Sequence, residues 1–381
     1  MKLSINISFL LVLFIFSINH VLRIVDKTDV NENRKLADKP KIDINRLDYY
    51  PSKYESYLND NFAGRSYFVE FYGWLNSNIL HKKTLSKRYI LGEENYIFSM
   101  PKSLPLYTGK RSVTEEQLNR IGKEFLERQI YFKSKGVKMY IQVIPSKYKV
   151  HSDKLPLLLH KGKNHMGDRF VKFFRENTTI PIIDGTVIMA DKRIKESVYL
   201  KYDTHWSKLG AFYVHSVLID SMKKDFPGML EMDTAKYFIT AFEKEGGNMK
   251  WVAPNKEDMD FGFKIKPKNK TFKKAEGYVH TMADFRYGQD QYCIRYKSDN
   301  TQLPKVLMIR DSFGSFTLSF LPESFRETLF IWDDWKYKFN KDIVDIENPV
   351  AIVYSFYEGY IDRILMEPSF VIPNEEERDI Q

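Results

Sequence analysis

Helical and buried-strand patterns alternate through the middle of the chain. Thr114 to Gln117 form a capping box, and apolar residues follow at helical spacing, which predicts a helix that ends at Gly136. A buried strand that stops at Pro145 is predicted by the β-branched run VKMYIQVIP. The segment IPIIDGTVIM predicts a second strand that ends near Asp184.

The same alternation returns later in the chain. Apolar residues from Leu209 to Val217 line one helical stripe, and Ser207 is placed to cap the N-terminus of that helix. Val306–Ile309 is a short apolar run typical of a buried strand. The pattern as a whole predicts an α/β fold with an open, mostly parallel sheet and helices on both faces.

The N-terminus has the pattern of an export signal. Residues 1–22 contain Lys2 and then an apolar stretch without a clear cleavage site, which favours an uncleaved signal anchor; a cleaved signal peptide is the alternative. We therefore expect the bulk of the protein to be periplasmic or otherwise extracytoplasmic, held at the inner membrane by its N-terminal helix.

The other domain boundaries are predicted where the regular spacing of apolar residues is lost. Residues 23–95 are polar and tyrosine-rich, and we interpret them as an N-terminal extension with a helix after Asp60 and paired strands around Gly92. The catalytic domain is predicted to span 96–381. Within it the pattern loosens at about 223–304, which we interpret as an insertion.

Composition narrows the functional classes. The net charge of +9 suits an anionic polymer or a membrane face, but lysines are spread along the chain and no compact nucleic-acid motif is present. The densest basic run, KIKPKNKTFKK at 264–274, is interpreted as a solvated loop. The single cysteine, Cys293, excludes an internal disulfide and a multi-cysteine zinc site.

An acid and a histidine precede the helix capped by Ser207. Asp203 and His205 lie two positions apart in an extended segment, where residues two apart share a side. Taken alone, Asp203 could cap a helix, His205 could be structural and Trp206 could be core. A metal site would need further ligands that the sequence does not place nearby.

A serine follows the predicted strand Val306–Ile309. Ser312 lies just beyond its carboxyl end, where ligands of open α/β sheets bind, and the next helix would direct backbone N–H groups toward a developing oxyanion. A serine hydroxyl needs a base to take its proton and an acid to orient that base. We hypothesise that Ser312, His205 and Asp203 take these three roles.

Several segments carry a family resemblance. They are ENRKLADKP, LNDNFAGR (with Asp60, Phe62 and Arg65), GEENYIF, VIPSKYKVHSDKLP, KYDTHWSKLGA, VLMIRDSFG and NPVAIVYSFYEGYIDRIL. Together they resemble the exported SGNH-hydrolase-like acetyltransferases, the family of the alginate O-acetyltransferases and their DHHW-motif relatives. The resemblance covers most of the chain and implies an SGNH-like fold with permuted motif order, because the acid and base precede the nucleophile.

The resemblance also implies roles for individual residues. It makes Asp203, His205 and Ser312 the catalytic triad, with no cofactor and no metal. It places near the site a group of substrate-binding or supporting residues, namely Lys147, Trp206, Asn248, Arg310 and Asp311. The chain departs from the family pattern at Arg310, where many members have glycine, at Ser355, where an acid is common, and at GGNMK (246–250), where Gly-Asp-Leu is usual.

The activity implied by the resemblance is O-acetylation of an extracellular or cell-surface polysaccharide. A membrane-bound acyltransferase would pass acetyl groups outward, Ser312 would carry the acetyl group, and a sugar hydroxyl would accept it. A carbohydrate acetylesterase with the same triad is an alternative, because only the exclusion of water from the acyl-enzyme separates the two reactions. A non-catalytic glycan-binding assembly factor is a further alternative.

Overall fold

The structure is a computed structural model. It describes residues 37–61, 65–75, 84–86, 88–244, 246–255, 257–276, 288, 292–333 and 335–371, together with Phe14 and Leu22. The predicted signal anchor, apart from these two residues, lies outside the described residues, as does Phe62. Every helix within the described ranges is too short or too polar to cross a bilayer.

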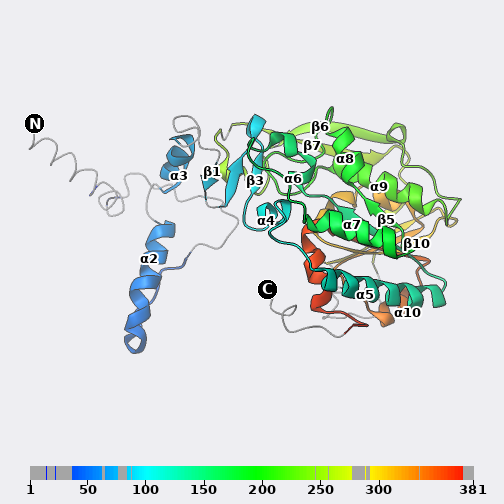
Figure 1. Cartoon of the computed structure of the whole chain (residues 1–381). Helices are drawn as coiled ribbons and strands as arrows, with labels where there is room; N and C mark the ends of the chain where they lie inside the picture. Colours follow the sequence, from blue (N-terminus) through cyan, green and yellow to red (C-terminus); the bar gives the residue numbers. More distant parts are fainter. Residues whose placement is uncertain are drawn as a thin grey trace, which may run out of the picture.

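The N-terminal extension is built of short helices and a small sheet. Its elements are η1 (Ile44–Tyr49), α2 (Tyr50–Asn61), α3 (Arg65–Trp74) and the antiparallel strands β1 (Thr84–Ser86), β2 (Tyr89–Leu91) and β3 (Ile97–Ser99). The predicted strands around Gly92 are confirmed. Asp60 belongs to α2, which buries no residue and projects from the main body (Figure 1), and the helix expected after it is α3.

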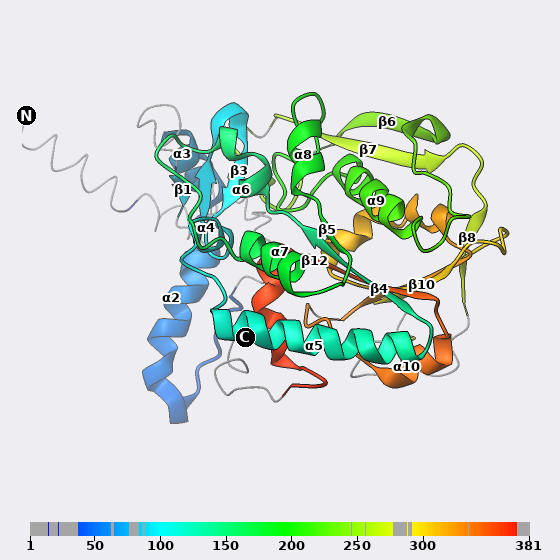
Figure 2. The same ribbon diagram turned by 45° about the vertical axis from the view of Figure 1, so that its right-hand side comes forward.

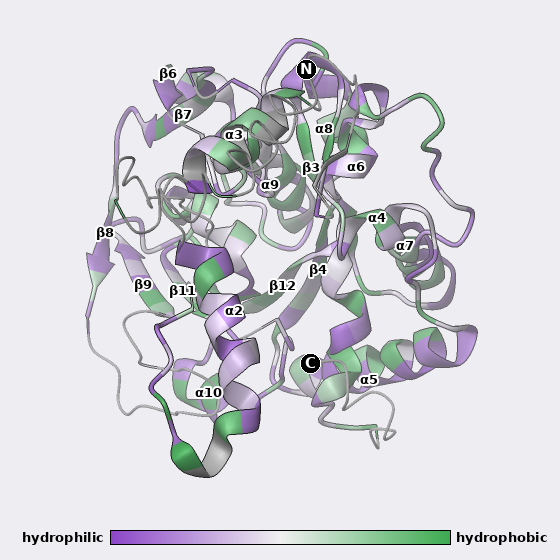
Figure 3. Ribbon diagram, turned by 90° about the vertical axis from the view of Figure 1, so that its left-hand side faces the viewer, coloured by the Kyte–Doolittle hydropathy of each residue, from purple (hydrophilic) through white to green (hydrophobic). Residues whose placement is uncertain are grey.

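The main body is organised around a seven-stranded sheet in the order β5-β4-β12-β10-β11-β9-β8. Its strands are β4 (Lys138–Ile144), β5 (Ile182–Asp184), β8 (Phe272–Ala275), β9 (Cys293–Ser298), β10 (Lys305–Arg310), β11 (Glu327–Trp332) and β12 (Ala351–Tyr357). The five strands from β5 to β11 pair in parallel, and β9 and β8 extend the edge antiparallel. The hydrophobic strand β12 lies in the interior (Figure 3). The predicted mostly parallel sheet is confirmed.

Helices cover both faces of this sheet (Figure 2). One face packs against α5 (Glu115–Ser134), α7 (Met166–Asn177), α10 (Lys341–Glu347) and η9 (Glu358–Met366). The other packs against α8 (Thr186–Lys192), α9 (Lys208–Met222), η7 (Ser312–Thr317) and η8 (Leu321–Ser324). Alternate residues of β4 enter opposite cores, Ile141 on the first side and Tyr140 on the second, as the period of a strand requires.

Smaller elements fill the connections. They are η3 (Glu93–Asn95), α4 (Ser103–Tyr107), α6 (Lys147–Val150), η4 (Ser152–Lys154), η5 (Thr234–Lys236) and η6 (Lys250–Val252).

The predicted helix caps are present. Thr114 Oγ1 accepts the backbone N–H of Gln117 while the Gln117 side chain accepts the N–H of Thr114, so α5 starts with the capping box expected from the sequence. Ser207 Oγ accepts the N–H of Gly210 and caps α9. These caps fix where the helices begin, and the cap of α9 therefore fixes the end of the loop that carries Asp203 and His205.

The stretch predicted as an insertion contains strands. β6 (Tyr237–Lys244) and β7 (Asp260–Pro267) pair antiparallel in a two-stranded sheet, which we call the β6–β7 ribbon, and β8 and β9 join the main sheet. The interpretation of the lysine-rich run 264–274 as a loop is therefore wrong. Its lysines alternate with apolar residues at strand spacing, so that Ile265 is buried while Lys264 and Lys266 are exposed. The domain boundaries themselves stay predictions.

Candidate active site

The acid and the base lie on one closed loop. An antiparallel bridge between Tyr199 and Trp206 joins the two ends of this loop, and the backbone N–H of Ser207 donates to the carbonyl of Val198. Trp206 is fully buried, and its Nε1 donates to the carbonyl oxygen of Phe313 at 3.0 Å. The loop is thereby attached directly to the turn that carries the serine.

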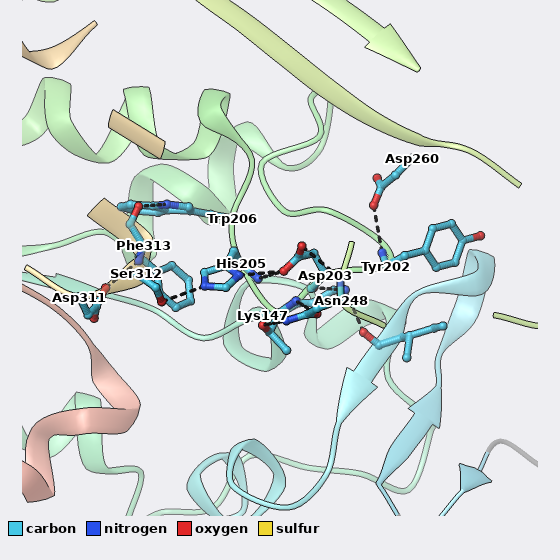
Figure 4. Close-up of polar contacts among 12 residues, drawn as sticks. Lys147, Tyr202, Asp203, His205, Trp206, Asn248, Asp260, Asp311, Ser312 and Phe313 are labelled. Atoms are coloured by element: carbon cyan, nitrogen blue, oxygen red, sulfur yellow. Dashed lines mark hydrogen bonds and ion pairs between the residues drawn. The ribbon is translucent and has the colours of Figure 1, made fainter. Parts of the chain in front are cut away.

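Asp203, His205 and Ser312 form a continuous hydrogen-bonded chain (Figure 4). The distance from His205 Nδ1 to Asp203 Oδ1 is 2.8 Å, and that from His205 Nε2 to Ser312 Oγ is 2.9 Å. With its Nδ1 proton donated to the carboxylate, the imidazole presents Nε2 as the acceptor of the hydroxyl proton. Although His205 and Ser312 are 107 positions apart, the three residues are brought into the geometry of a nucleophile, a base and an orienting acid.

The environment keeps Asp203 ionised. Burial by itself would raise the pKa of its carboxyl group, but the hydrogen bonds from His205 outweigh burial and hold the pKa below the ordinary value for aspartate. The imidazole of His205 packs near two aromatic rings, with its centroid 4.7 Å from that of Phe313 and 5.5 Å from that of Phe316. An ionised acid and these two ring contacts favour one orientation of the base.

Asp311 shapes the turn that presents Ser312. Its buried carboxylate accepts hydrogen bonds from the backbone N–H groups of Phe313 and Tyr357 and from the hydroxyl of Tyr337, at 2.7–2.8 Å. Burial raises its pKa. Asp311 therefore supports the nucleophile turn from within the core, and it does not contact His205 by a hydrogen bond.

The helix expected after Ser312 is a six-residue 3₁₀ helix, η7. Two of its first N–H groups are occupied, because that of Phe313 donates to the Asp311 side chain and that of Gly314 to the Asp311 carbonyl. Among the described residues, none accepts a hydrogen bond from the backbone N–H of Ser312. Fewer backbone N–H groups of η7 are thus free to bind an oxyanion than the sequence predicted.

Arg310 lies behind the turn. Its guanidinium donates to the carbonyl of Asp311 and to Ser315 Oγ and stacks 5.4 Å from the ring centroid of Trp332. Burial lowers its pKa to about 10. Since Arg310 is 2% exposed and is not among the residues that line the cavity beside Ser312, it has a supporting position.

Lys147 connects three segments beneath the loop. Its Nζ donates to the carbonyls of Ile97, Lys201 and Asp203 at 2.8, 2.7 and 3.2 Å. Burial lowers its pKa to about 7. Its ammonium group therefore ties β3 to the loop of the acid, which accords with the sequence-based expectation of a residue near the site.

Asn248 holds the loop from the other side. Its Oδ1 accepts the N–H of Thr204 at 3.2 Å, its Nδ2 donates to Thr204 Oγ1 at 3.0 Å, and its backbone N–H donates to Asp203 Oδ2 at 3.4 Å. Sequence reasoning missed the preceding residue, Gly247. A Cβ atom there would lie 2.0 Å from Asp203 Oδ2, so only glycine fits. The adjacent pair Gly246-Gly247 is the signal that could have revealed it.

A cavity of about 340 Å³ opens beside Ser312 and His205. Aromatic side chains contribute much of its wall, namely Phe98, Tyr148, Phe313, Tyr357 and Tyr360. Lys102 and Arg111 line it as well, and neither was singled out from the sequence. A cavity with aromatic side chains beside the serine has the size and lining of a small-molecule binding site. Among the described residues, no three His, Cys, Asp or Glu side chains converge so as to hold a metal ion.

The family comparison agrees with the sequence motifs. Residues 100–268 match the family model of the SGNH hydrolase-like domain of acetyltransferase AlgX. This range contains Asp203 and His205 and ends before Ser312. The predicted family resemblance is confirmed, and with it the enzyme class of this region, an SGNH-type O-acetyltransferase. A search of curated protein sequences found no match.

Solved structures show the same fold. PatB1 of Bacillus cereus is 16% identical, with a TM-score of 0.53 over 72% of this chain and 96% of that one, and a second structure of PatB1 carries a sulfonyl adduct. A DHHW family protein from Eubacterium siraeum is also 16% identical, with a TM-score of 0.52 over 76% of this chain and 93% of that one. At this identity the likeness confirms the predicted SGNH-like fold.

Proposed function

We propose that the protein is an exported O-acetyltransferase that acetylates hydroxyl groups of an extracellular or cell-surface polysaccharide through an acetyl-serine at Ser312. The observation that carries the proposal is the hydrogen-bonded chain from Asp203 through His205 to Ser312, within a fold and a family of SGNH-type acetyltransferases. The aromatic cavity beside the serine supports a sugar as the acceptor.

In the first half-reaction Ser312 takes the acetyl group. His205 Nε2 removes the hydroxyl proton while Ser312 Oγ bonds to the carbonyl carbon of the donor ester, and the backbone N–H of Ser312 is the available donor to the resulting oxyanion. His205 then gives the proton to the leaving oxygen of the donor. The carbon–oxygen bond to that oxygen breaks, and acetyl-serine is left.

In the second half-reaction the acetyl group moves to the acceptor. A sugar hydroxyl loses its proton to His205 Nε2 and attacks the acetyl carbonyl carbon, after which the bond to Ser312 Oγ breaks and Oγ regains the proton. Asp203 stabilises the imidazolium in both halves through the bond to Nδ1. If water takes the place of the sugar, the product is acetate, which is the acetylesterase alternative.

Export and the supply of acetyl groups belong to the same proposal. The apolar N-terminal stretch would hold the protein at the membrane, with residues 96–381 as the catalytic domain outside the cytoplasm. By analogy with the family that the chain resembles, a membrane-bound acyltransferase would deliver the acetyl group. The stretch at about 223–304, which we propose as the insertion, would add the β6–β7 ribbon to this domain.

Covalent labelling tests the nucleophile. We expect phenylmethylsulfonyl fluoride to modify Ser312, located by peptide mass spectrometry, and we expect the label to be absent from the Ser312→Ala variant and slow to form in His205→Ala. The matched control is Ser315→Ala, which changes an exposed serine on the same short helix. Labelling that persists in Ser312→Ala would show that another residue is the nucleophile, and no labelling of the folded wild type would favour the non-catalytic alternative.

Product analysis tests the acceptor. The purified protein is incubated with p-nitrophenyl acetate and an oligosaccharide, and the products are separated by mass spectrometry. The transferase proposal expects a mass increase of one acetyl group on the sugar that depends on Ser312. Release of acetate at the same rate with and without sugar, and no acetylated sugar, would identify an esterase.

A further inference from the structure

The β6–β7 ribbon has an outer face that is exposed over most of its length. Register places Phe238 opposite Lys266, Thr240 opposite Lys264 and Phe242 opposite Gly262 on this face. The opposite face carries Tyr237 and Ile265, which are buried against α9 and the core around it. Phe238 is 60% exposed and Phe242 is 37% exposed, so both rings are open to solvent on this face.

The outer face is strongly basic. Lys264, Lys266 and Lys268 are exposed along it, and Lys244 lies at its far end. Among the residues of β6 and β7, all of which are described, the one acid in the outward register is Asp260, which is buried and accepts the backbone N–H of Tyr202. Glu243, the other acid of the two strands, is exposed but lies in the opposite register, so the outer face presents an excess of cations, which favours an anionic ligand.

Both aromatic rings lie beside lysines on this face, and that of Phe242 also lies over a glycine. A Cβ atom at Gly262 would meet the ring of Phe242 at 2.7 Å, so the ring covers the glycine. The ammonium group of Lys264 is 5.2 Å from the centroid of Phe242, and that of Lys268 is 5.7 Å from the centroid of Phe238. Each ring is thus paired with a cation, and the two rings are four strand residues, or about 13 Å, apart.

The face continues toward the catalytic loop. The connection between β6 and β7 carries Asn248, which hydrogen-bonds to Asp203 and Thr204. Lys208, the first residue of α9, has a lowered pKa because it is partly buried and because Lys266 is close enough to repel its charge. The positive potential of the ribbon therefore extends to three residues from His205.

We propose that the outer face of the β6–β7 ribbon is a binding platform for an anionic polysaccharide, separate from the cavity at Ser312. An extended chain would place sugar rings over Phe238 and Phe242 while its carboxylate or sulfate groups meet the lysines. Aromatic rings that alternate with lysines along an extended face offer both stacking and charge contacts to an acidic sugar chain. This inference rests on the proposed function for its choice of a polysaccharide, and it adds a site that would hold the polymer during acetyl transfer.

Binding to a polyuronate tests the platform. Retention of the purified protein by immobilised polygalacturonate is measured for the wild type and two double variants, with uncharged dextran as the reference matrix. We expect Phe238→Ala with Phe242→Ala to weaken binding at least fivefold, and Lys264→Glu with Lys266→Glu to weaken it at least tenfold. The matched control is Lys123→Glu with Lys133→Glu, which makes the same charge change on exposed residues of α5, away from the ribbon (Figure 1).

Each outcome decides the proposal. Hydrolysis of p-nitrophenyl acetate should stay within twofold of the wild type in all three variants, because this small ester does not reach the platform. An equal loss of binding in the control would show that only net charge matters and would contradict the proposed platform. Wild-type binding by both ribbon variants would contradict it as well. Binding to phosphatidylglycerol vesicles but not to polygalacturonate would assign the face to a membrane. Labelling of Ser312 is independent of all these results, so failure of the platform and failure of the proposed function are distinguishable.

Discussion

Replacing Gly247 with alanine tests whether the loop that connects β6 and β7 positions Asp203, the proposed catalytic acid. The backbone at Gly247 lies directly against the Asp203 carboxylate, and an added Cβ atom would be 2.0 Å from Oδ2 and 2.4 Å from both Cβ and Cγ of Asp203. Gly247 does not have a positive φ, so alanine is compatible with the backbone itself. The substitution therefore acts on the acid and leaves the turn conformation allowed.

The size of the effect follows from the overlap. Ordinary van der Waals contact begins near 3.4 Å, so the Cβ atom and the carboxylate must separate by about 1.4 Å. A misplacement of about 1 Å in a catalytic group costs roughly 100-fold in rate. We expect kcat/KM for p-nitrophenyl acetate to fall about 100-fold, equivalent to about 2.7 kcal/mol of transition-state stabilisation.

The assay compares Gly247→Ala with Gly228→Ala. A Cβ atom at Gly228 would meet nothing within 4 Å, so this control should keep wild-type kinetics. Thermal unfolding is measured in parallel to show that both variants are folded. Wild-type kcat/KM in a folded Gly247→Ala variant would refute the argument that this loop positions Asp203, and an equal loss in Gly228→Ala would show that the assay reports general damage.

Three further predictions concern buried groups around the triad. Because burial lowers the pKa of Lys147 to about 7, the unfolded chain binds one more proton than the folded chain between about pH 7 and 10. The melting temperature of the wild type should therefore rise across that interval relative to that of Lys147→Met, and equal pH dependence of the two melting temperatures would contradict the lowered pKa. Asp311→Ala leaves three buried donors without their acceptor and should lower the free energy of unfolding by about 3 kcal/mol in urea titrations, whereas a loss below about 1 kcal/mol would mean that other groups replace the carboxylate. Trp206→Phe removes the hydrogen bond to Phe313 and should lower the free energy of unfolding by about 1–3 kcal/mol. It should also lower kcat more than it changes KM, and a change in KM alone would mean that Trp206 acts in substrate binding.

Much of the fold could be predicted because its signals are local. The capping box at Thr114 and the cap at Ser207 depend on residues three positions apart, and the strand at Val306–Ile309 depends on a continuous apolar run. The meeting of His205 with Ser312 could be anticipated for a different reason. Ser312 follows β10 of the parallel sheet, whereas His205 lies on the loop between α8 and α9, so their meeting was expected from the roles that a triad requires and from the family resemblance.

Other features depend on contacts that no local pattern encodes. The lysine-rich run at 264–274 was assigned to a loop because its charge outweighed its strand periodicity, although Ile265 packs into the core. Asn248 and Gly247 contact Asp203 because the loop that connects β6 and β7 packs against residue 203, which is more than 40 positions earlier in the sequence. Contacts between segments far apart in the sequence depend on how whole helices and strands pack, and a single sequence does not reveal this packing.

The position of β12 in the sheet has a consequence for the order of assembly. β4, near the start of the catalytic domain, and β10, which leads to Ser312, do not touch as strands; β12 lies between them and pairs with both. Because β12 follows Ser312 in the sequence, a nascent chain that has emerged only as far as residue 312 still lacks the strand that joins the two parts of its sheet. The contacts of the serine turn with Tyr357, at the end of β12, therefore cannot form until that strand has been made.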